Sequence, residues 1–350
     1  MKLSAQHSHP LSERLLHLGA MVSILAMIGA CGGGADGSQF TPPPPAPAPQ
    51  PIPAQTSVPE PVGYDEYRLA AFNRINQIRL SAGLGMLEQN IELDRAAQAH
   101  ANWQIANGIF SHLEDVGSNG FTGVNWWDRD AAAGYKVSQG TEVMVTGAAP
   151  ASGVDVLVNM AYHRAGILQF EPLDVGIGFT PEGVDGFSEL LVAEIAFPDD
   201  DTFRSAGQLP QAFVDGVVVW PLDGAANVAA GMGHEIPDPV PDTDVLTLGT
   251  PASVGISESK TIVVQRFEMF EDLTDAPVSV ALMTHDTDTN HILAPYTAEI
   301  VPTELLHHNT KYRVEFVGNS ISTLDSTKTE LSITWRFSTG NEDYLSGGLS

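Results

Sequence analysis

A histidine and an arginine, His163 and Arg164, lie directly before a short apolar run in the stretch AYHRAGILQF, residues 161–170. A histidine in this position can bind a metal ion, act as a general base or pack as an ordinary core residue. The arginine can orient a carboxylate or a carbonyl bidentately, or pair with a carboxylate of the protein itself. The local sequence leaves these alternatives open, and the fold must decide what else lies near His163.

The sequence lacks the residues that most other kinds of catalysis in a folded domain require. The single cysteine, Cys31, precedes the segments expected to fold, which excludes thiol chemistry in a folded domain and any intrachain disulfide. No nucleophilic-serine elbow, phosphate-binding loop or zinc-protease helix is present in the sequence. The 43 Asp and Glu against 16 Lys and Arg give a formal net charge of −27. Such a charge argues against nucleic acid as a partner and against electrostatic docking on anionic lipid.

The first 62 residues are expected to direct export and then to tether the protein. A weakly basic start is followed by an apolar run that ends in small residues and is short for a membrane-spanning helix, as in an export signal. The tetrapeptide IGAC at 28–31 resembles the lipobox of bacterial lipoproteins, which implies cleavage before Cys31 and acyl chains on that residue. We therefore predict a lipoprotein signal peptide over 1–30 and a Pro- and Gly-rich tether over 31–62. The alternative is an ordinary signal peptide with an incidental cysteine.

Two folded domains are predicted after the tether. Residues 63–200 begin with two amphipathic helical patterns, which Gly83 and Gly108 end, and continue with β-rich runs such as DVGIGF and LLVAEIAF. This order favours an α+β fold arranged as an α–β–α sandwich. Residues 212–341 contain short β-type runs between Pro, Gly, Asp and Asn clusters, which is typical of an all-β, immunoglobulin-like sandwich. Residues 342–350 are expected to form a tail.

Five stretches of the first domain follow one another in a characteristic order. They are FNRINQIRLSAGLGMLEQNIELDRAAQAHANWQIANGIFSH at 72–112, WWDRDAAAGY at 126–135, TEVMVTG at 141–147, NMAYHRAGIL at 159–168 and DVGIGF at 174–179. Their order and spacing resemble bacterial domains of the CAP superfamily, which comprises cysteine-rich secretory, antigen 5 and pathogenesis-related proteins. The domain of this family is also called SCP. The resemblance covers about residues 64–198 and implies the fold of that family.

The resemblance also implies a cleft that carries two histidines and acidic partners. By position these are His112 of the FSH motif, Glu142 of TEV and His163, with Arg164 beside it. Two imidazoles and a carboxylate can bind a divalent ion such as zinc and leave one position open for water, so His112 and His163 are candidate metal ligands. The same set can instead hold a water molecule by hydrogen bonds and act as a general base.

The sequence departs from the family pattern around these residues. Met160, Ala161 and Tyr162 stand where the family has Ser-Pro-Gly before the second histidine. The second cleft carboxylate has no clear counterpart, and the nearest candidates are Glu114 and Asp115.

The function expected from these features is that of an exported lipoprotein, anchored to the cell envelope or cell surface through Cys31, that binds a lipid, glycan or peptide in a cleft of histidine and glutamate. One alternative is a metal-assisted hydrolase that uses the same cleft. Another is a structural or adhesion protein with a vestigial cleft and a cell-surface partner. The stretch VVVWPLDGAANVAAGMGHEIPDPVP at 217–241 resembles a segment that often follows the CAP domain in bacterial lipoproteins. The second domain is expected to be a spacer or binding module without chemistry.

Overall fold

The computed structural model describes residues 50–51, 54–199, 208–209, 216–241 and 243–344. The predicted signal peptide and Cys31 lie outside the described residues, as does much of the tether. In the part of the chain that is described, no helix is long and apolar enough to cross a membrane.

A helix–sheet region occupies residues 54–199. Its sheet has the strand order β2-β4-β5-β3, in which the two-residue β2 runs parallel to β4 and the other neighbours are antiparallel. The strands are β2 (Glu88–Gln89), β3 (Val137–Thr146), β4 (Asp174–Glu182) and β5 (Ser188–Pro198). The helices are α1 (Glu66–Ser81), α2 (Ile91–Asn107), α3 (Trp126–Ala133), α4 (Pro150–Val158) and α5 (Ala161–Ile167).

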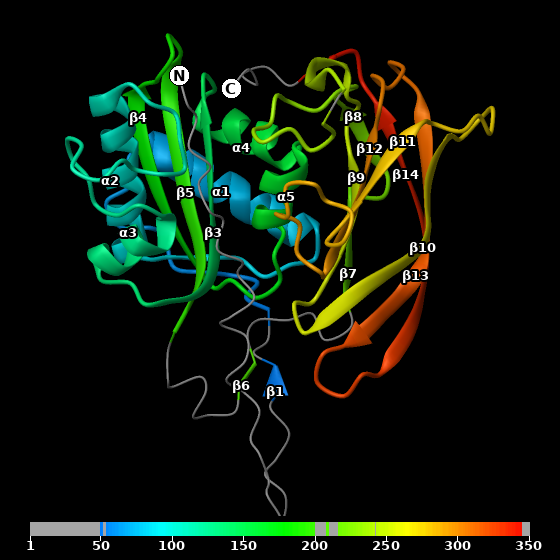
Figure 1. Cartoon of the computed structure of the whole chain (residues 1–350), viewed down its shortest axis with the longest axis horizontal. Coiled ribbons are helices and arrows are strands. Elements are labelled where there is room, and N and C mark those ends of the chain that lie inside the picture. The colour runs from blue at the N-terminus through cyan, green and yellow to red at the C-terminus, as the bar shows by residue number, and fades with distance from the viewer. Residues whose placement is uncertain (1–49, 52–53, 200–207, 210–215, 242, 345–350) are drawn as a thin grey trace, which may run out of the picture. The chain divides into compact units, whose positions relative to one another are not determined.

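The helices cover both faces of this sheet. Figure 1 shows α2 and α3 on one side of β3, β4 and β5, and α1, α4 and α5 on the other. The central strand β5 is buried along most of its length because both of its faces are covered. The mixed helix-and-sheet character predicted for this region is therefore confirmed, in the α–β–α arrangement.

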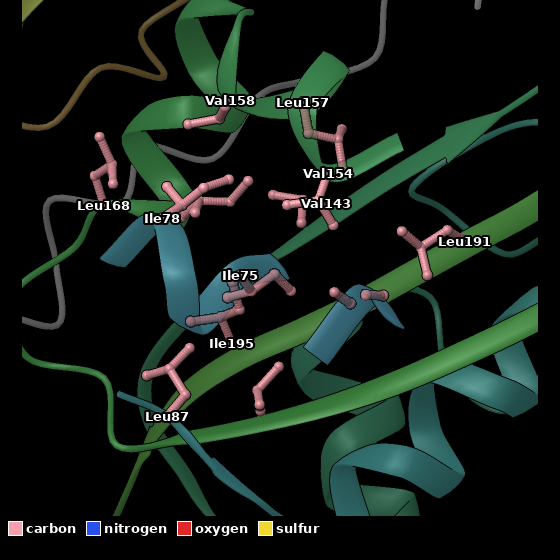
Figure 2. Packing of buried hydrophobic residues seen from close by; sticks show 14 of the residues in the cluster. Ile75, Ile78, Leu87, Val143, Val154, Leu157, Val158, Leu168, Leu191 and Ile195 are labelled. Atoms are coloured by element: carbon pink, nitrogen blue, oxygen red, sulfur yellow. The ribbon is translucent and has the colours of Figure 1, made fainter. Parts of the chain in front are cut away.

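The largest apolar core lies between the sheet and the α1–α4 layer. Figure 2 shows side chains from both helices and from the sheet directed into this one cluster, among them Ile75, Val154, Val143 and Ile195. The burial of such side chains, at about 1.5–3 kcal/mol each, is the main force that holds these layers together.

Helix α2 packs unusually close to strand β4, and the sequence shows why. Asn90 caps the helix by accepting hydrogen bonds from the amides of Glu92 and Leu93. A Cβ atom on Gly176 would lie 2.1 Å from the backbone of Leu93, and one on Gly178 would lie 2.4 Å from that of Ala97. The glycines of the DVGIGF motif thus permit the close approach of helix and strand.

A β-rich region occupies the described residues from 216 to 344. It has one sheet in the order β11-β12-β9-β7 and another in the order β10-β13-β14-β8. The strands are β7 (Val217–Trp220), β8 (Ala225–Val228), β9 (Ala252–Ile256), β10 (Lys260–Glu271), β11 (Val280–Thr284), β12 (Thr297–Pro302), β13 (Lys311–Ser322) and β14 (Lys328–Thr339). A 3₁₀ turn, η2 (Val245–Thr247), precedes β9, and the two-residue strands β1 (Gln50–Pro51) and β6 (Gln208–Leu209) pair in parallel.

Both sheets of the β-rich region contribute to one apolar cluster, which includes Val254, Ile300, Phe316 and Trp335. The alternation of buried and less buried residues along β13 matches the period of two that a strand imposes. The sheet-rich character predicted for the C-terminal part of the chain is confirmed.

The two regions share buried apolar contacts and belong to one compact unit. Val218 of β7 joins the core of the helix–sheet region. Tyr162 of α5 packs in turn with Met232, Leu248 and other apolar residues of the β-rich region. The predicted boundary between residues 200 and 212 falls mostly outside the described residues, yet the segments on its two sides pack against each other.

Candidate functional site

A pocket of about 210 Å³ opens where the two regions meet. Most of its wall comes from the helix–sheet region, through the loop after α2, the start of α3, strand β3 and helix α5. The β-rich region supplies the rest. The lining residues are His112, Trp126, Thr141, Glu142, Val143, Tyr162, His163, Ile236, Pro237 and Ile292.

The first histidine of the pocket is held by a buried carboxylate. Nδ1 of His112 lies 2.8 Å from Oε1 of Glu142, which projects from strand β3. The other carboxylate oxygen of Glu142 accepts a 2.5 Å hydrogen bond from Nη2 of Arg129 on α3. Burial alone would raise the pKa of Glu142. The hydrogen bond from His112 and the electrostatic effects of His100 and Arg129 outweigh burial and hold this pKa well below its usual range. Glu142 is therefore an ionised acceptor, and Nδ1 of His112 must carry the hydrogen.

The second histidine has a carboxylate of its own, which comes from the β-rich region. Nδ1 of His163 lies 2.8 Å from Oε1 of Glu235. That oxygen also accepts hydrogen bonds from the backbone amides of Tyr162 and His163, at 2.8 and 3.1 Å. The other oxygen accepts one from the amide of Ala161 at 2.9 Å. Glu235 is only 1% exposed, and both of its carboxylate oxygens are held by hydrogen bonds from the first residues of α5.

The two imidazole rings face the same small space. Their centroids are 6.2 Å apart and their planes are inclined by 33°. In both rings Nδ1 contacts a carboxylate, and Nε2 has no partner among the described residues. When the rings are neutral, each Nε2 is thus a hydrogen-bond acceptor that can hold a donor group of a ligand or take a proton from water.

Comparison with known proteins identifies the segment that carries both histidines. Residues 72–186 match the CAP family, the cysteine-rich secretory protein family. The resemblance of the sequence motifs to this family is thereby confirmed over this CAP segment. The CAP segment includes His112, Glu142 and His163 and ends before Glu235.

Three solved structures are each similar to part of this chain. An outer surface protein from Borrelia burgdorferi is 15% identical, with a TM-score of 0.32, over 37% of this chain and 90% of that one. An extracellular protein with an SCP domain from Bacillus anthracis is 18% identical, with a TM-score of 0.31, over 36% and 39%. Venom allergen-like protein 4 from Schistosoma mansoni is 13% identical, with a TM-score of 0.28, over 42% and 94%. This chain thus spans well under half of the Bacillus protein, and no curated protein matches it.

Arg164, expected in the cleft, does not line the pocket. Its guanidinium is buried and donates hydrogen bonds to the carboxylate of Glu299 on β12 and to the carbonyl of Pro251. Consecutive residues of a helix point about 100° apart. When His163 faces the pocket, Arg164 is therefore directed into the β-rich region, where it acts as an ion-pair partner.

Glu114, one of the two candidates for the second cleft carboxylate, lies behind the pocket. It is buried and accepts hydrogen bonds from the amides of Thr122 and Gly123. Its Oε1 lies 3.0 Å from Nδ1 of His100, a second buried histidine that does not line the pocket. Burial lowers the pKa of His100. Glu114 thus shapes the loop that carries His112, and the carboxylate that serves His163 is Glu235.

A layer of buried carboxyl groups lies behind Glu142. Glu194 on β5 stands directly opposite Glu142 across the antiparallel pair, and Asp130 on α3 is buried nearby. No oxygen of Asp130 or Glu194 accepts a hydrogen bond from a described residue. Burial, followed by the charge of Glu142, raises the pKa of Asp130 to about 7 and that of Glu194 well above its usual value. Burial thus favours the protonated form of Glu194, which can donate its hydrogen to Glu142.

Sequence patterns did not predict Glu235, or Ile236 and Pro237, which come directly after it and line the pocket. The stretch GMGHEIPDPV has no periodicity of its own, and a single glutamate between turn residues is usually a solvated charge. The only available signal was that this stretch resembles segments that commonly follow a CAP domain.

The donor set does not fit a resident zinc ion. Among the described residues, no group of three or more His, Cys, Asp or Glu side chains is placed to hold a metal. His112 and His163 could supply two nitrogens, but both nearby carboxylates are already held by hydrogen bonds from the protein. Catalytic zinc sites usually have three protein ligands, so no step is assigned to a metal.

Proposed function

We propose that this protein is an exported CAP-domain protein that binds a small ligand in the pocket between His112 and His163. One observation carries the proposal: two histidines, each fixed by a buried carboxylate, present unpartnered Nε2 atoms to one pocket. Both rings are partly exposed, with 41% of the His112 side chain and 13% of the His163 side chain open to solvent, so a ligand in the pocket can reach the two Nε2 atoms. The apolar lining from Trp126 and Ile292 suits the non-polar part of a lipid, glycan or peptide.

The test is a titration of the purified chain with three probes: octanoate, cellobiose and N-acetyl-alanyl-alanine amide. NMR of the histidine ring nitrogens reports contact at Nε2. We expect one probe to shift the Nε2 signals of His112 and His163, and the double variant His112→Ala/His163→Ala to lose its binding. The control His307→Ala, an exposed histidine of the β-rich region, should bind as the wild type does. A probe that binds the double variant unchanged would place the binding site elsewhere and favour a vestigial cleft.

A hydrolase remains the second candidate, because carboxylate-backed imidazoles with a free Nε2 can activate water as general bases. The reaction would need no nucleophilic side chain. Hydrolysis of p-nitrophenyl acetate by the wild type, abolished in both single alanine variants of His112 and His163, would support it. A rate equal to that of the control His307→Ala in either variant would argue against it. Metal analysis of the same samples tests the metal-assisted form: stoichiometric zinc that both variants lose would support it.

We also propose that the protein is a bacterial lipoprotein, anchored to the cell envelope through Cys31, and that its β-rich region is an immunoglobulin-like sandwich. The lipobox-like IGAC and the Pro-rich stretch after it support the anchor. The two four-stranded sheets around one apolar cluster support the sandwich. Metabolic labelling with a palmitate analogue should mark the wild type and spare Cys31→Ser. Equal labelling of both would contradict the anchor.

A further inference from the structure

We infer that Glu235 is a positioning residue for His163, and that the β-rich region is therefore part of the site rather than a spacer. The inference rests on the proposed function of the pocket. The contacts that carry it are intramolecular, however, and can be measured without any ligand.

Four donors surround the carboxylate of Glu235. Three consecutive backbone amides, those of residues 161–163, and one ring nitrogen all lie within 3.1 Å of the two oxygens of Glu235. A buried carboxylate is stable only when it is paired or hydrogen-bonded, and these contacts satisfy it. The amides hold the carboxylate in one position relative to α5. The hydrogen bond from Nδ1 to this carboxylate therefore also holds the ring of His163 in one orientation.

The contact with Glu235 also sets the tautomer of His163. Oε1 of Glu235 accepts hydrogen bonds from two amides, so the contact with Nδ1 requires the ring to donate. The neutral ring then carries its hydrogen on Nδ1, and Nε2 keeps a lone pair. A carboxylate behind a histidine sets ring orientation and tautomer in this way in many sites. Glu142 does the same for His112, so the pocket presents two acceptor nitrogens.

Other residues of the β-rich region also reach the pocket beside Glu235. Ile236 and Pro237 follow it directly into the pocket wall. Ile292, which also lines the pocket, is held by Asp288, which accepts hydrogen bonds from the amides of Ile292 and Leu293. Asp288 also accepts a 2.5 Å hydrogen bond from the hydroxyl of Tyr162, next to His163. Two separate segments of the β-rich region are therefore anchored on α5 at the pocket.

A purely structural role is the competing explanation, because Glu235 also caps the start of α5. The two roles predict different results for the ring of His163. A cap alone contributes to the stability of the helix but leaves the ring free to adopt the Nε2–H form that free histidine prefers. A positioning residue holds the Nδ1–H form, and its removal changes the tautomer.

The experiment is long-range ¹H–¹⁵N NMR on the full chain labelled at histidine, at a pH where both rings are neutral. We expect the Nδ1–H form for His163 in the wild type and a change to mainly Nε2–H in Glu235→Ala. Glu235→Gln keeps an acceptor oxygen and should retain the Nδ1–H form. The matched control is Glu299→Ala, which removes another buried carboxylate at the same junction, one that contacts Arg164, and should leave the ring of His163 unchanged.

Two results would overturn the inference. One is an Nε2–H form of His163 in the wild type, which needs no variant and stays decisive even if Glu235→Ala fails to fold. The other is an unchanged Nδ1–H form in a folded Glu235→Ala protein, which would leave Glu235 as a helix cap only. Neither result depends on whether octanoate, cellobiose or the peptide amide binds, so failure of this inference and failure of the proposed function are distinguishable.

Discussion

The two histidines of the pocket are held by carboxylates of different origin. His112 is held from within the CAP segment by Glu142, 30 residues away, and Arg129 and the buried carboxyl layer support that glutamate from behind. His163 is held by Glu235, 72 residues away and outside the CAP segment. The amides of α5 are the other donors to Glu235.

This difference shows that equivalent ring geometry can be reached by two kinds of support. On the His112 side the support is electrostatic, because one guanidinium stabilises the ionised Glu142 beside carboxyl groups whose pKa values are raised by burial. On the His163 side the support is a set of backbone hydrogen bonds that requires the β-rich region to be docked. The first should be sensitive to the removal of charge and to pH, and the second to changes at the junction.

The largest effect is expected for Arg129→Ala, which removes the buried cation beside Glu142. Breaking a buried ion pair from one side typically lowers the free energy of unfolding by about 3–5 kcal/mol. Urea denaturation followed by tryptophan fluorescence measures the loss. The matched control is Arg74→Ala, which breaks a partly exposed pair with Asp155 and should cost at most about 1 kcal/mol. Equal losses in the two variants would contradict the electrostatic account of the His112 side.

The second-largest effect is expected for Glu235→Ala, which should lower the free energy of unfolding by about 3 kcal/mol. The variant leaves the amides of residues 161–163 without their acceptor, and an unsatisfied buried group costs about 1–3 kcal/mol. The same urea titration applies. Asp343→Ala removes an exposed carboxylate of the same region, paired with His308, and should change stability by no more than about 0.5 kcal/mol. A loss as small as that of the control would mean that the contact between α5 and the β-rich region contributes little to stability.

Glu194→Gln should change the pH dependence of stability. Burial raises the pKa of Glu194 above its unfolded value, so the folded protein keeps a proton that the unfolded chain releases. The folded state therefore loses stability as pH rises above the unfolded pKa of about 4.5. The glutamine variant cannot ionise, and relative to the wild type it should gain up to about 1.4 kcal/mol per pH unit.

Urea midpoints measured from about pH 5 to pH 8 test this, because that range begins just above the unfolded pKa of a glutamate. The control Glu330→Gln replaces an exposed glutamate on β14 and should follow the wild-type profile. Parallel profiles for Glu194→Gln and the wild type would show that Glu194 is ionised in the folded protein.

The smallest effect on stability is expected for Ile236→Ala, because this side chain is 63% exposed at the pocket rim. Its unfolding free energy should stay within about 0.5 kcal/mol of the wild type. The binding of octanoate, if octanoate is the probe that binds, should weaken measurably by isothermal titration calorimetry. Leu324→Ala, an exposed apolar residue far along the sequence at the β13–β14 turn, is the control. Unchanged octanoate affinity in Ile236→Ala would show that the rim does not contact this ligand.

Local sequence patterns predicted the helices well. They did not predict which residues contact the histidines of the pocket. The helix that Gly83 was expected to end finishes at Ser81, and the one expected to end at Gly108 finishes at Asn107. The residues predicted for the cleft, His112, Glu142 and His163, do meet in one pocket. Their role in binding or catalysis stays a prediction. Arg164 departs from expectation because its direction depends on which face of a short helix is buried.

Sequence pattern was sufficient to predict the helices, the strands and the order of motifs that marks the CAP segment. These depend on periodicity, caps and glycine, which act over a few residues. The three-dimensional fold was needed to find that Glu235 reaches His163, that Glu194 is buried opposite Glu142, and that Arg164 pairs with Glu299. The physical reason is that the position and protonation of a carboxyl group depend on burial and on neighbours brought from distant segments, and no local pattern specifies either.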